Sequence, residues 1–129
     1  SSAGVDESCS MMWSRTDLKT SDIDIAEIYD GFTIYAVEWI EALGLCGKYE
    51  AGELLEGGSK ISLNGEIPMS TNGGQLSAGR LHGFGAFHEA CQQLRGEAEQ
   101  RQVPNSPQIA VVTSGAESFS SALLLGAPR

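Results

Sequence analysis

Two short, continuous apolar runs near the end of the chain constrain its fold more than any other feature. Ile109–Val112 and Ala122–Leu125 contain only apolar residues. Such runs are typical of strands that are buried on both faces, because a strand with one solvated face alternates apolar and polar residues. The small and polar residues 114–121 between the runs allow a tight turn. The sequence therefore predicts two buried strands in its last quarter.

The first half of the chain predicts a strand followed by a helix. Three isoleucines stand among acidic residues at positions 23–28, a short β-favouring run that predicts a strand. From residue 32 to residue 43 the apolar residues recur mostly at helical spacing, and Gly44 is expected to end that helix.

The middle of the chain predicts a hairpin and a second helix. Asn64-Gly65 stands between residues 61–63 and 66–67, and an Asn-Gly pair supplies the positive φ that a tight hairpin turn needs. Residues 86–94 predict a helix with a glycine close behind its end. Strands, helices and hairpin together predict one α/β domain.

The two ends of the chain suggest a piece of a longer protein. The chain begins with Ser1 rather than Met and ends at Arg129 after an apolar run. Residues 1–20 are polar, and we expect them to be an irregular segment left by truncation; the alternative is that the patch Met11-Met12-Trp13 docks on another surface. The domain itself is expected over residues 21–129.

The charge of the chain limits its partners. Its 8 basic and 17 acidic residues give a net charge of −9. Such a surface repels phosphate backbones, so we expect no nucleic-acid partner, and an anionic ligand would need local basic groups or backbone N–H donors. No apolar run approaches the roughly 18 residues of a membrane span. With no signal-peptide pattern either, the expected location is the cytoplasm.

Three cysteines, Cys9, Cys46 and Cys91, are odd in number and unevenly spaced. This spacing fits neither a disulfide framework nor a zinc cluster. We therefore expect a reducing compartment, and neither a bound metal nor a bound cofactor.

A glycine-dense stretch, residues 71–85, is the strongest candidate for a binding site. Glycines let the backbone approach a ligand closely, and the helix that follows offers unpaired N–H groups to an anion or a developing oxyanion. The stretch has neither the third glycine of a dinucleotide fingerprint nor the Gly-Lys-Ser/Thr of a P-loop. Asn72, Arg80 and His82 lie within it and favour a site over a loop that only packs a helix against a sheet.

Two side chains are candidates for chemistry. His82 lies in the glycine-dense stretch and could donate a hydrogen bond to a carbonyl oxygen or accept a proton. His88 is six residues away, so the two histidines do not share a helical face and a shared metal is not expected. Tyr29 follows the first predicted strand, where the sites of α/β domains open, and its phenol could bind an oxyanion. Packing is the alternative role for this ring.

Three motifs, in this order, resemble the C-terminal domain of the thiolase superfamily. Residues 21–32, Ser-Asp-Ile-Asp-Ile-Ala-Glu-Ile-Tyr-Asp-Gly-Phe, resemble the entry to that domain, and residues 41–46 resemble the helix end that follows. Residues 72–83 resemble the Gly-Gly-x-x-Ser-x-Gly-His-Pro-x-Gly loop of the family. The resemblance covers roughly residues 15–129 and is closest to the sterol-carrier-protein type and to the steroid side-chain aldolases of the lipid-transfer-protein type. It implies the C-terminal half of the α-β-α-β-α layered sandwich, with a mixed five-stranded sheet and helices.

The chain departs from the thiolase pattern at the residues that carry thiolysis. Arg80 stands where the family has its activating His, Thr113 where it has its second acid/base Cys, and Tyr29 where it has the oxyanion-hole Asn or His. An Arg side chain cannot act as a base at neutral pH, because the guanidinium stays protonated. A Thr hydroxyl cannot replace a thiolate. The resemblance therefore implies that thiolase chemistry is lost.

Within this family, the pattern implies retro-aldol cleavage of a β-hydroxyacyl-CoA with a steroid or lipid side chain. The alternatives are a non-catalytic lipid or acyl-CoA carrier and a genuine acyl-CoA acyltransferase. A retro-aldol step needs a base for the hydroxyl proton and donors for the thioester enolate, and no cysteine nucleophile. Tyr29 and His82 are the expected catalytic residues. The expected substrate- or oxyanion-binding residues are Asn72, Gly73, Gly74, Arg80 and Gly83.

The resemblance also implies partners. The expected ligand is a coenzyme A thioester, as substrate. The expected protein partners are an N-terminal thiolase domain, a second copy in a homodimer, and a small OB-fold, zinc-ribbon protein. The isolated chain is expected to be inactive.

Overall fold

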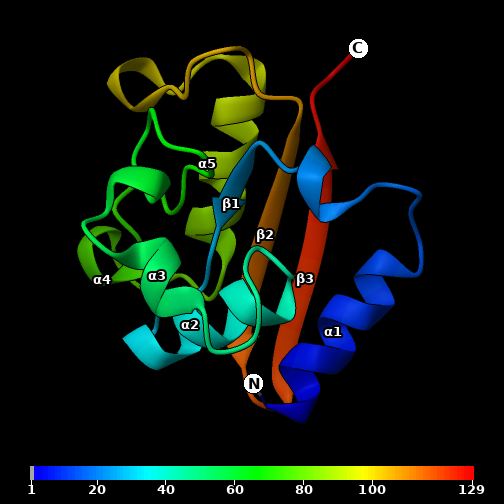
Figure 1. Cartoon of the computed structure of the whole chain (residues 1–129). Coiled ribbons are helices and arrows are strands. Elements are labelled where there is room, and N and C mark those ends of the chain that lie inside the picture. Colours follow the sequence, from blue (N-terminus) through cyan, green and yellow to red (C-terminus); the bar gives the residue numbers. More distant parts are fainter. Residues whose placement is uncertain (1) are drawn as a thin grey trace.

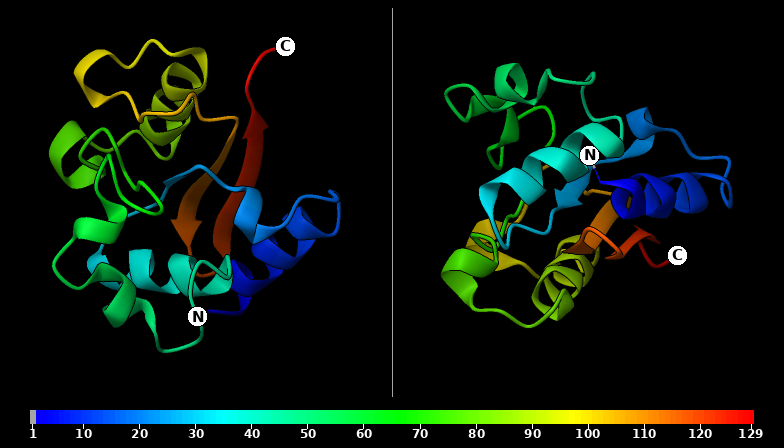
Figure 2. Two further views of the ribbon diagram at one scale, coloured as in Figure 1. Left: turned by 45° about the horizontal axis from the view of Figure 1, so that its top comes forward. Right: turned by 90° about the horizontal axis from the view of Figure 1, so that it is seen from below.

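The computed structural model describes residues 2–129, which form three layers (Figure 1). A sheet stands in the middle; helices α1 and α2 lie on one face and helix α5 on the other, as the right-hand view of Figure 2 shows. The strands are β1 (Ile25–Glu27), β2 (Ile109–Ala116) and β3 (Phe119–Gly126). The α-helices are α1 (Ala3–Trp13), α2 (Thr33–Ala42), α3 (Ala51–Leu55), α4 (Gln75–Ala78) and α5 (Phe84–Arg95). The 3₁₀ helices are η1 (Thr20–Asp22), η2 (Ser59–Ile61) and η3 (Glu99–Arg101).

The sheet combines one parallel and one antiparallel pair in the order β1-β2-β3. In the parallel pair, Ile25 lies opposite Ala110 and Glu27 opposite Val112. The helices from α2 to α5 lie in the crossover between these two strands, as a parallel connection requires. Because β1 and β2 run the same way, their carboxyl ends lie at the same edge of the sheet, where α/β domains place their sites.

Each face of the sheet has its own hydrophobic cluster. On the side of α1 and α2, Trp39 and Leu43 are fully buried with Val5 and Cys9. On the side of α5, a stripe of apolar residues at four-residue spacing covers the sheet. The members of that cluster on α5, β1 and β2 are Ala86, Ala90, Leu94, Ile25, Ala110 and Val112.

Glycines end the two longest helices of the crossover, α2 and α5, and both predicted helices are confirmed. Gly44 follows α2 with φ 79°, and Gly96 follows α5 with φ 72°. This left-handed conformation is the usual helix end, and glycine adopts it without steric cost.

The first 20 residues are not the irregular segment that the sequence predicts. Among the described residues of this segment, Ala3–Trp13 form helix α1, which buries Val5, Cys9 and Met12. These three residues recur at helical spacing, but the polar residues between them make this apolar pattern difficult to recognise in the sequence. The helix packs along β3, where Ser8 Oγ donates to the Ser120 carbonyl oxygen at 3.0 Å.

The hairpin predicted around Asn64-Gly65 is wrong, and so is the count of five strands. The chain does reverse there, because the Gly65 N–H donates to the Ser62 carbonyl at 2.8 Å. Neither residue adopts a positive φ, however, and residues 59–61 form the 3₁₀ helix η2 instead of a strand. The sheet of residues 2–129 has three strands, with one further parallel bridge from Ala26 to Met69.

Strand β3 is not buried on both faces as predicted. Exposed residues alternate along β3, so one of its faces is open, whereas all of β1 and residues 110–113 of β2 are buried. Leu123 of β3 is 49% exposed and Phe119 is 88% exposed. A run of apolar residues on an edge strand therefore presents an apolar surface that residues 2–129 leave open.

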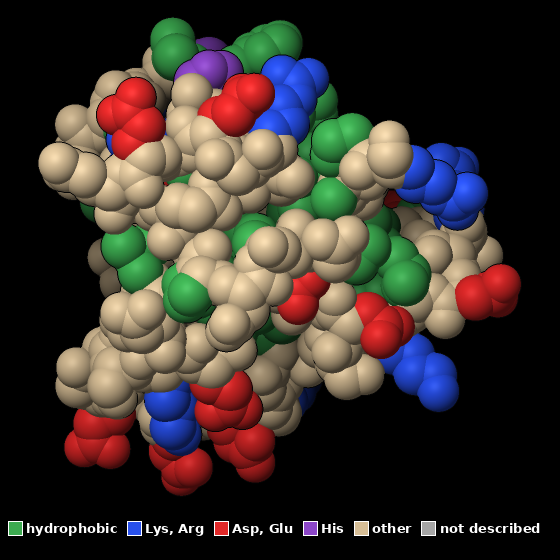
Figure 3. Space-filling model, turned by 90° about the horizontal axis from the view of Figure 1, so that it is seen from above, with side chains coloured by type: hydrophobic (Ala, Val, Ile, Leu, Met, Phe, Trp, Pro, Cys, Tyr) green, Lys and Arg blue, Asp and Glu red, His purple; other side chains and the backbone are tan. Residues whose placement is uncertain are grey.

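The surface reflects the acidic composition. Acidic side chains gather along one edge of the face seen in Figure 3, in keeping with the net charge of −9. Within residues 2–129, no helix combines the length and the apolar character that crossing a membrane would require.

Candidate functional site

A cavity opens at the carboxyl ends of β1 and β2. Three parts of the chain form its wall: the end of β1, the glycine-dense stretch with the start of α5, and one residue of β2. The lining residues are Glu27, Ile28, Tyr29, Asp30, Ser70, Asn72, Gly74, Gln75, Gly79, Leu81, Gly83, Gly85, Ala86 and Thr113. We call this the β1 cavity. Its position matches the edge at which the parallel pair ends.

Tyr29 is fixed in the β1 cavity from two sides. Its backbone N–H donates to the Thr113 hydroxyl on β2 at 2.8 Å. Its phenol folds back over Gly31, and a Cβ atom at that position would lie 2.5 Å from the Tyr29 Oη. The ring of Tyr35 lies 6.3 Å away, centroid to centroid. The position of the half-buried phenol therefore requires a glycine at residue 31.

Two short hydrogen bonds shape the glycine-dense stretch: one joins it to Asp30, which follows β1, and the other lies within it. Asp30 Oδ1 accepts from the Gln75 N–H at 2.9 Å, and Asn72 Oδ1 accepts from the Gly74 N–H at 2.9 Å. Gly74 has φ 73° and ψ 170°, a conformation almost confined to glycine, and a Cβ atom there would overlap the Asp30 carboxylate. The turn therefore requires a glycine for both its conformation and its closeness to β1.

His82 lies beside the β1 cavity rather than in it. It has φ 48°, its side chain is exposed, and its carbonyl oxygen accepts from the Ser114 hydroxyl at 3.1 Å. Its side chain borders a second hollow with Phe84, Phe87 and Leu123. Gly83 and Thr113 line both hollows, so these two residues separate them.

The structure brings some of the predicted site residues together and not others. Tyr29, Asn72, Gly74 and Gly83 line the β1 cavity. His82 lines the neighbouring hollow. Gly73 and Arg80 are exposed and line neither of these two hollows.

A buried polar cluster beneath the β1 cavity was not predicted from the sequence. Glu27 and Glu89 are 1% and 2% exposed, and the Thr71 hydroxyl lies between their carboxyl groups. Burial raises the pKa of Glu27 to about 7, against hydrogen bonds from Thr71 that lower it. The only sequence signal for this cluster is a Glu inside an otherwise apolar strand.

Two of the three cysteines, Cys9 and Cys46, are poor nucleophiles in this fold. Burial, and then the nearby Asp6 carboxylate, raises the pKa of the Cys9 thiol to about 12. Burial also raises the pKa of Cys46, with Glu41 and Glu50 adding to the shift. Both thiols are therefore protonated at neutral pH. Among residues 2–129, no three His, Cys, Asp or Glu side chains gather as a metal site would require.

Comparison with known proteins identifies the family. Residues 2–125 match the model of the thiolase C-terminal domain-like family. The chain belongs to this family. A 17-hydroxy-3-oxo-4-pregnene-20-carboxyl-CoA lyase from Mycobacterium tuberculosis is 34% identical over 115 residues, which are 89% of this chain and 29% of the lyase. Sterol carrier protein 2 from Bos taurus is 36% identical over 103 residues, 78% of this chain and 19% of that protein.

A solved structure, named Ltp2-ChsH2(DUF35) aldolase, has the same fold. It superposes with a TM-score of 0.87 at 31% identity, over 97% of this chain and 32% of that chain. The thiolase C-terminal domain-like chain thus spans less than a third of the lyase relative and about a third of the aldolase chain. The family resemblance read from residues 15–129 is confirmed, and the match also takes in helix α1.

Thr113 and Arg80 depart from the thiolase pattern, and their surroundings in the structure differ. Thr113, at the position expected for a second acid/base Cys, is 1% exposed and holds the backbone of Tyr29. Arg80, at the position expected for the activating His, is exposed and does not line the β1 cavity. In this thiolase C-terminal domain-like chain, the phenol of Tyr29 stands in the cavity without the thiolase acid/base pair.

Proposed function

We propose that the protein containing this chain cleaves a β-hydroxyacyl-CoA by a retro-aldol reaction. The observation that carries the proposal is the Tyr29 phenol, fixed by Thr113 and Gly31 in the same cavity as Asn72. The names of the relatives, a steroid-acyl-CoA lyase and an aldolase, support the same chemistry. The acyl group would be a steroid or lipid side chain.

The reaction needs one base and one set of donors. A base removes the proton of the β-hydroxyl group, the Cα–Cβ bond breaks, and the electron pair moves into the thioester as an enolate. Protonation of the enolate at Cα then gives a shorter acyl-CoA, and the former β-carbon leaves as a ketone. No oxidant, free coenzyme A or cysteine nucleophile takes part.

We assign roles to the predicted residues on their positions. Tyr29 acts on the hydroxyl proton or on the oxyanion. The Asn72 side-chain amide, whose Oδ1 accepts from the Gly74 N–H, and the backbone N–H of Gly83 stabilise the enolate oxygen, while Gly74 contributes to binding by forming the turn that orients Asn72. His82 would contact the part of the substrate that extends into the neighbouring hollow. The exposed Gly73 and Arg80 would meet the anionic coenzyme A portion.

The proposed reaction also requires protein that lies outside this chain. Phe84 is 75% exposed, Phe87 40% and Leu123 49%, and they border the hollow beside the β1 cavity. Exposed aromatic and aliphatic side chains next to a site mark a surface that another domain covers. We assign this surface to an N-terminal thiolase domain, and we propose a homodimer and an OB-fold, zinc-ribbon partner for the whole protein. The cytoplasm is the proposed location.

A cleavage assay on the full-length protein with its partner tests the proposed function. The substrate is a β-hydroxyacyl-CoA with a bulky ring, and the ketone and the short acyl-CoA are followed without added free coenzyme A. We expect release of both products. Activity that appears only with free coenzyme A and a β-ketoacyl-CoA would instead establish a thiolase. Binding of the acyl-CoA without either reaction would establish the carrier, the function class to which the sterol carrier protein relative points.

Replacing Gly31 by Ala is expected to displace the phenol of Tyr29. The new methyl group would lie 2.5 Å from Oη, so the ring has to move, and a shift of this kind should lower kcat by roughly tenfold or more. Gly52→Ala in α3 is the matched control, because a Cβ there meets nothing within 4 Å and kcat should not change. Equal kcat values for both variants would show that the position of the phenol does not limit turnover.

A further inference from the structure

The hydroxyl of Thr71 lies between two carboxyl groups and has a single proton to offer. Its Oγ1 lies 2.6 Å from Glu27 Oε1 and 2.8 Å from Glu89 Oε1. A hydroxyl donates once, so at most one of these two short contacts can use the Thr71 proton. If both carboxyl groups were ionised, the other contact would bring together two oxygens with no hydrogen between them. One of the two carboxyl groups must therefore be protonated.

Glu89 is the ionised member of the pair. The Arg101 guanidinium donates to both of its oxygens, from Nη2 to Oε2 at 3.0 Å and from Nε to Oε1 at 3.2 Å. Gln93 Nε2 donates to Oε1 at 3.2 Å. Burial raises the pKa of Glu89, but the hydrogen bonds from Arg101, Thr71 and Gln93 outweigh burial and lower it overall. The Thr71 proton therefore goes to Glu89, and the proton of the shorter contact comes from Glu27.

The second oxygen of Glu27 supports the same assignment. Glu27 Oε2 is buried and has no hydrogen-bond partner among residues 2–129. An ionised carboxylate would leave a charged oxygen without any donor in an apolar environment, which is very unfavourable. A neutral carboxyl group leaves only an unpaired carbonyl oxygen. The groups packed around Glu27 include a single cation, Arg101 of η3, and it is already paired with Glu89 of α5.

We propose that Glu27 is held as the neutral acid and acts as a positioning residue for the loop that begins at Thr71. The hydrogen bonds run from Glu27 through Thr71 to Glu89 and so connect β1, the glycine-dense stretch and α5. The Thr71 N–H also donates to Glu27 Oε1, at 3.3 Å. The next residue, Asn72, lines the β1 cavity, so the position of Thr71 sets the position of the Asn72 amide.

This arrangement makes the loop sensitive to pH. Glu27 has a raised pKa of about 7. The hydrogen bond that the Glu27 carboxyl group donates to Thr71 is therefore formed below this pH and is lost as the pH rises through it. Above it, two negative carboxylates face one another across Thr71, and only one of them can receive the Thr71 proton. The neutral state of Glu27 stands on the geometry alone, whereas its effect on catalysis rests on the proposed function.

Infrared difference spectroscopy on the full-length protein tests the neutral state without any assay of activity. A C=O band of a protonated carboxyl group should be present near pH 6, weaken as the pH rises through about 7, and be missing in Glu27→Gln. Glu53→Gln, the same change at an exposed position of α3, should leave the band in place. A band that is absent in the wild type, or unchanged in Glu27→Gln, overturns the proposal even if cleavage is observed.

The pH profile of cleavage tests the positioning role. In Glu27→Gln the amide replaces the acid as donor to Thr71, so kcat/KM near pH 6 should stay within about threefold of the wild type. Because only the wild type loses its donor at higher pH, the ratio of variant to wild-type kcat/KM should rise about tenfold from about pH 6 to about pH 8. Effects of other titrating groups cancel in this ratio. A ratio that stays constant overturns the positioning role.

A second pair of variants keeps the test valid if Glu27→Gln does not fold. Thr71→Ser retains the hydroxyl and should keep kcat/KM within about threefold, whereas Thr71→Val removes it and should lower kcat/KM by roughly tenfold or more. Equal activity of the two variants overturns the proposal. If the wild type shows no cleavage, the proposed function fails, and the infrared result still decides the state of Glu27.

Discussion

Replacing Tyr29 by Phe is expected to remove most of the carbon–carbon cleavage while leaving acyl-CoA binding intact. The phenol is the group of the β1 cavity to which we assign the hydroxyl proton or the oxyanion, and a positioned acid/base group contributes about 10²- to 10⁴-fold to a rate. We therefore expect kcat to fall by about 10²- to 10⁴-fold. The substrate dissociation constant should change by less than about threefold, because the ring and its packing remain.

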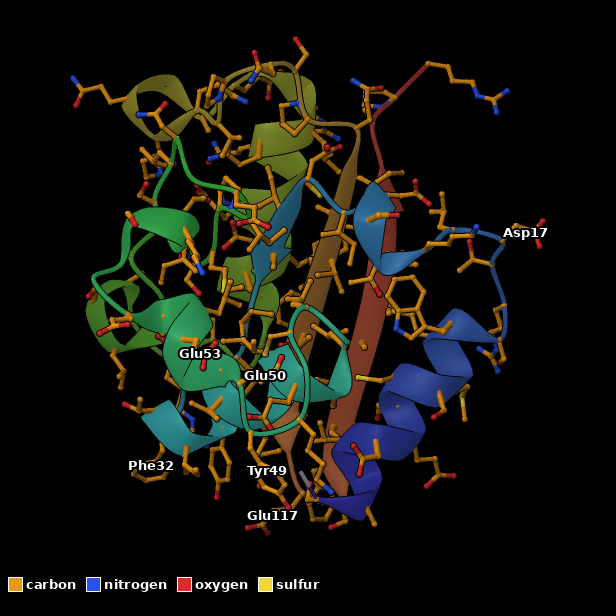
Figure 4. All side chains as sticks on the ribbon, viewed as in Figure 1. Asp17, Phe32, Tyr49, Glu50, Glu53 and Glu117 are labelled. Carbon is orange, nitrogen blue, oxygen red and sulfur yellow. The ribbon has the colours of Figure 1, made fainter. Side chains whose placement is uncertain are left out.

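Tyr35→Phe is the matched control for this prediction. Tyr35 lies beside Tyr29, but its hydroxyl donates to Glu117 at 3.3 Å. Figure 4 labels Glu117 at the lower end of the sheet, beyond the last residue of β2. The Tyr35 variant should therefore keep its kcat. Unchanged turnover in Tyr29→Phe would remove the phenol from the mechanism, and with it the structural basis of the proposed aldolase. Intact binding with no turnover in the wild type would favour the carrier.

The helices and strands that carry a strong local pattern could be predicted from the sequence. Helices α2 and α5 have apolar residues at helical spacing and a glycine directly behind them, so both patterns identify the same ends. Helix α1 could not be predicted, because its three buried residues stand among polar ones and are stabilised by packing on β3. The turn at Gly65 was predicted as a hairpin because Asn-Gly favours one, but residues 2–129 form no strand on either side of it.

Long-range proximity explains what the sequence could and could not tell about the site. Tyr29, Asn72 and Gly83 belong to motifs of the family, and the parallel pair brings them to one cavity. The sequence does not indicate that Thr113 binds the Tyr29 backbone, or that Glu27 meets Glu89 across Thr71, because these partners are far apart in the chain. Phe32, labelled in Figure 4, begins the apolar pattern of residues 32–43 but is 68% exposed; it is the residue before α2 and belongs to neither hydrophobic cluster.

Replacing Gly74 by Ala is expected to lower stability more than any other Gly→Ala substitution in the glycine-dense stretch. Its backbone, φ 73° and ψ 170°, lies in a region almost confined to glycine, which alone costs about 1–3 kcal/mol for another residue. The added Cβ would also overlap the Asp30 carboxylate and disrupt its hydrogen bond from Gln75. Loss of that bond adds about 1–3 kcal/mol, so the free energy of unfolding should fall by about 2–6 kcal/mol.

Gly79→Ala separates the two causes. Gly79 has φ 101° and ψ 152°, in the same region of backbone conformation, but a Cβ there meets nothing within 4 Å. The control should therefore lose only the conformational part, about 1–3 kcal/mol in urea unfolding of the full-length protein. Gly74→Ala should in addition lower kcat/KM by roughly 100-fold, because Asn72 and Gly74 form one turn of the cavity wall. Equal losses of stability in the two variants would mean that the Asp30 carboxylate moves aside freely and does not hold the loop against β1.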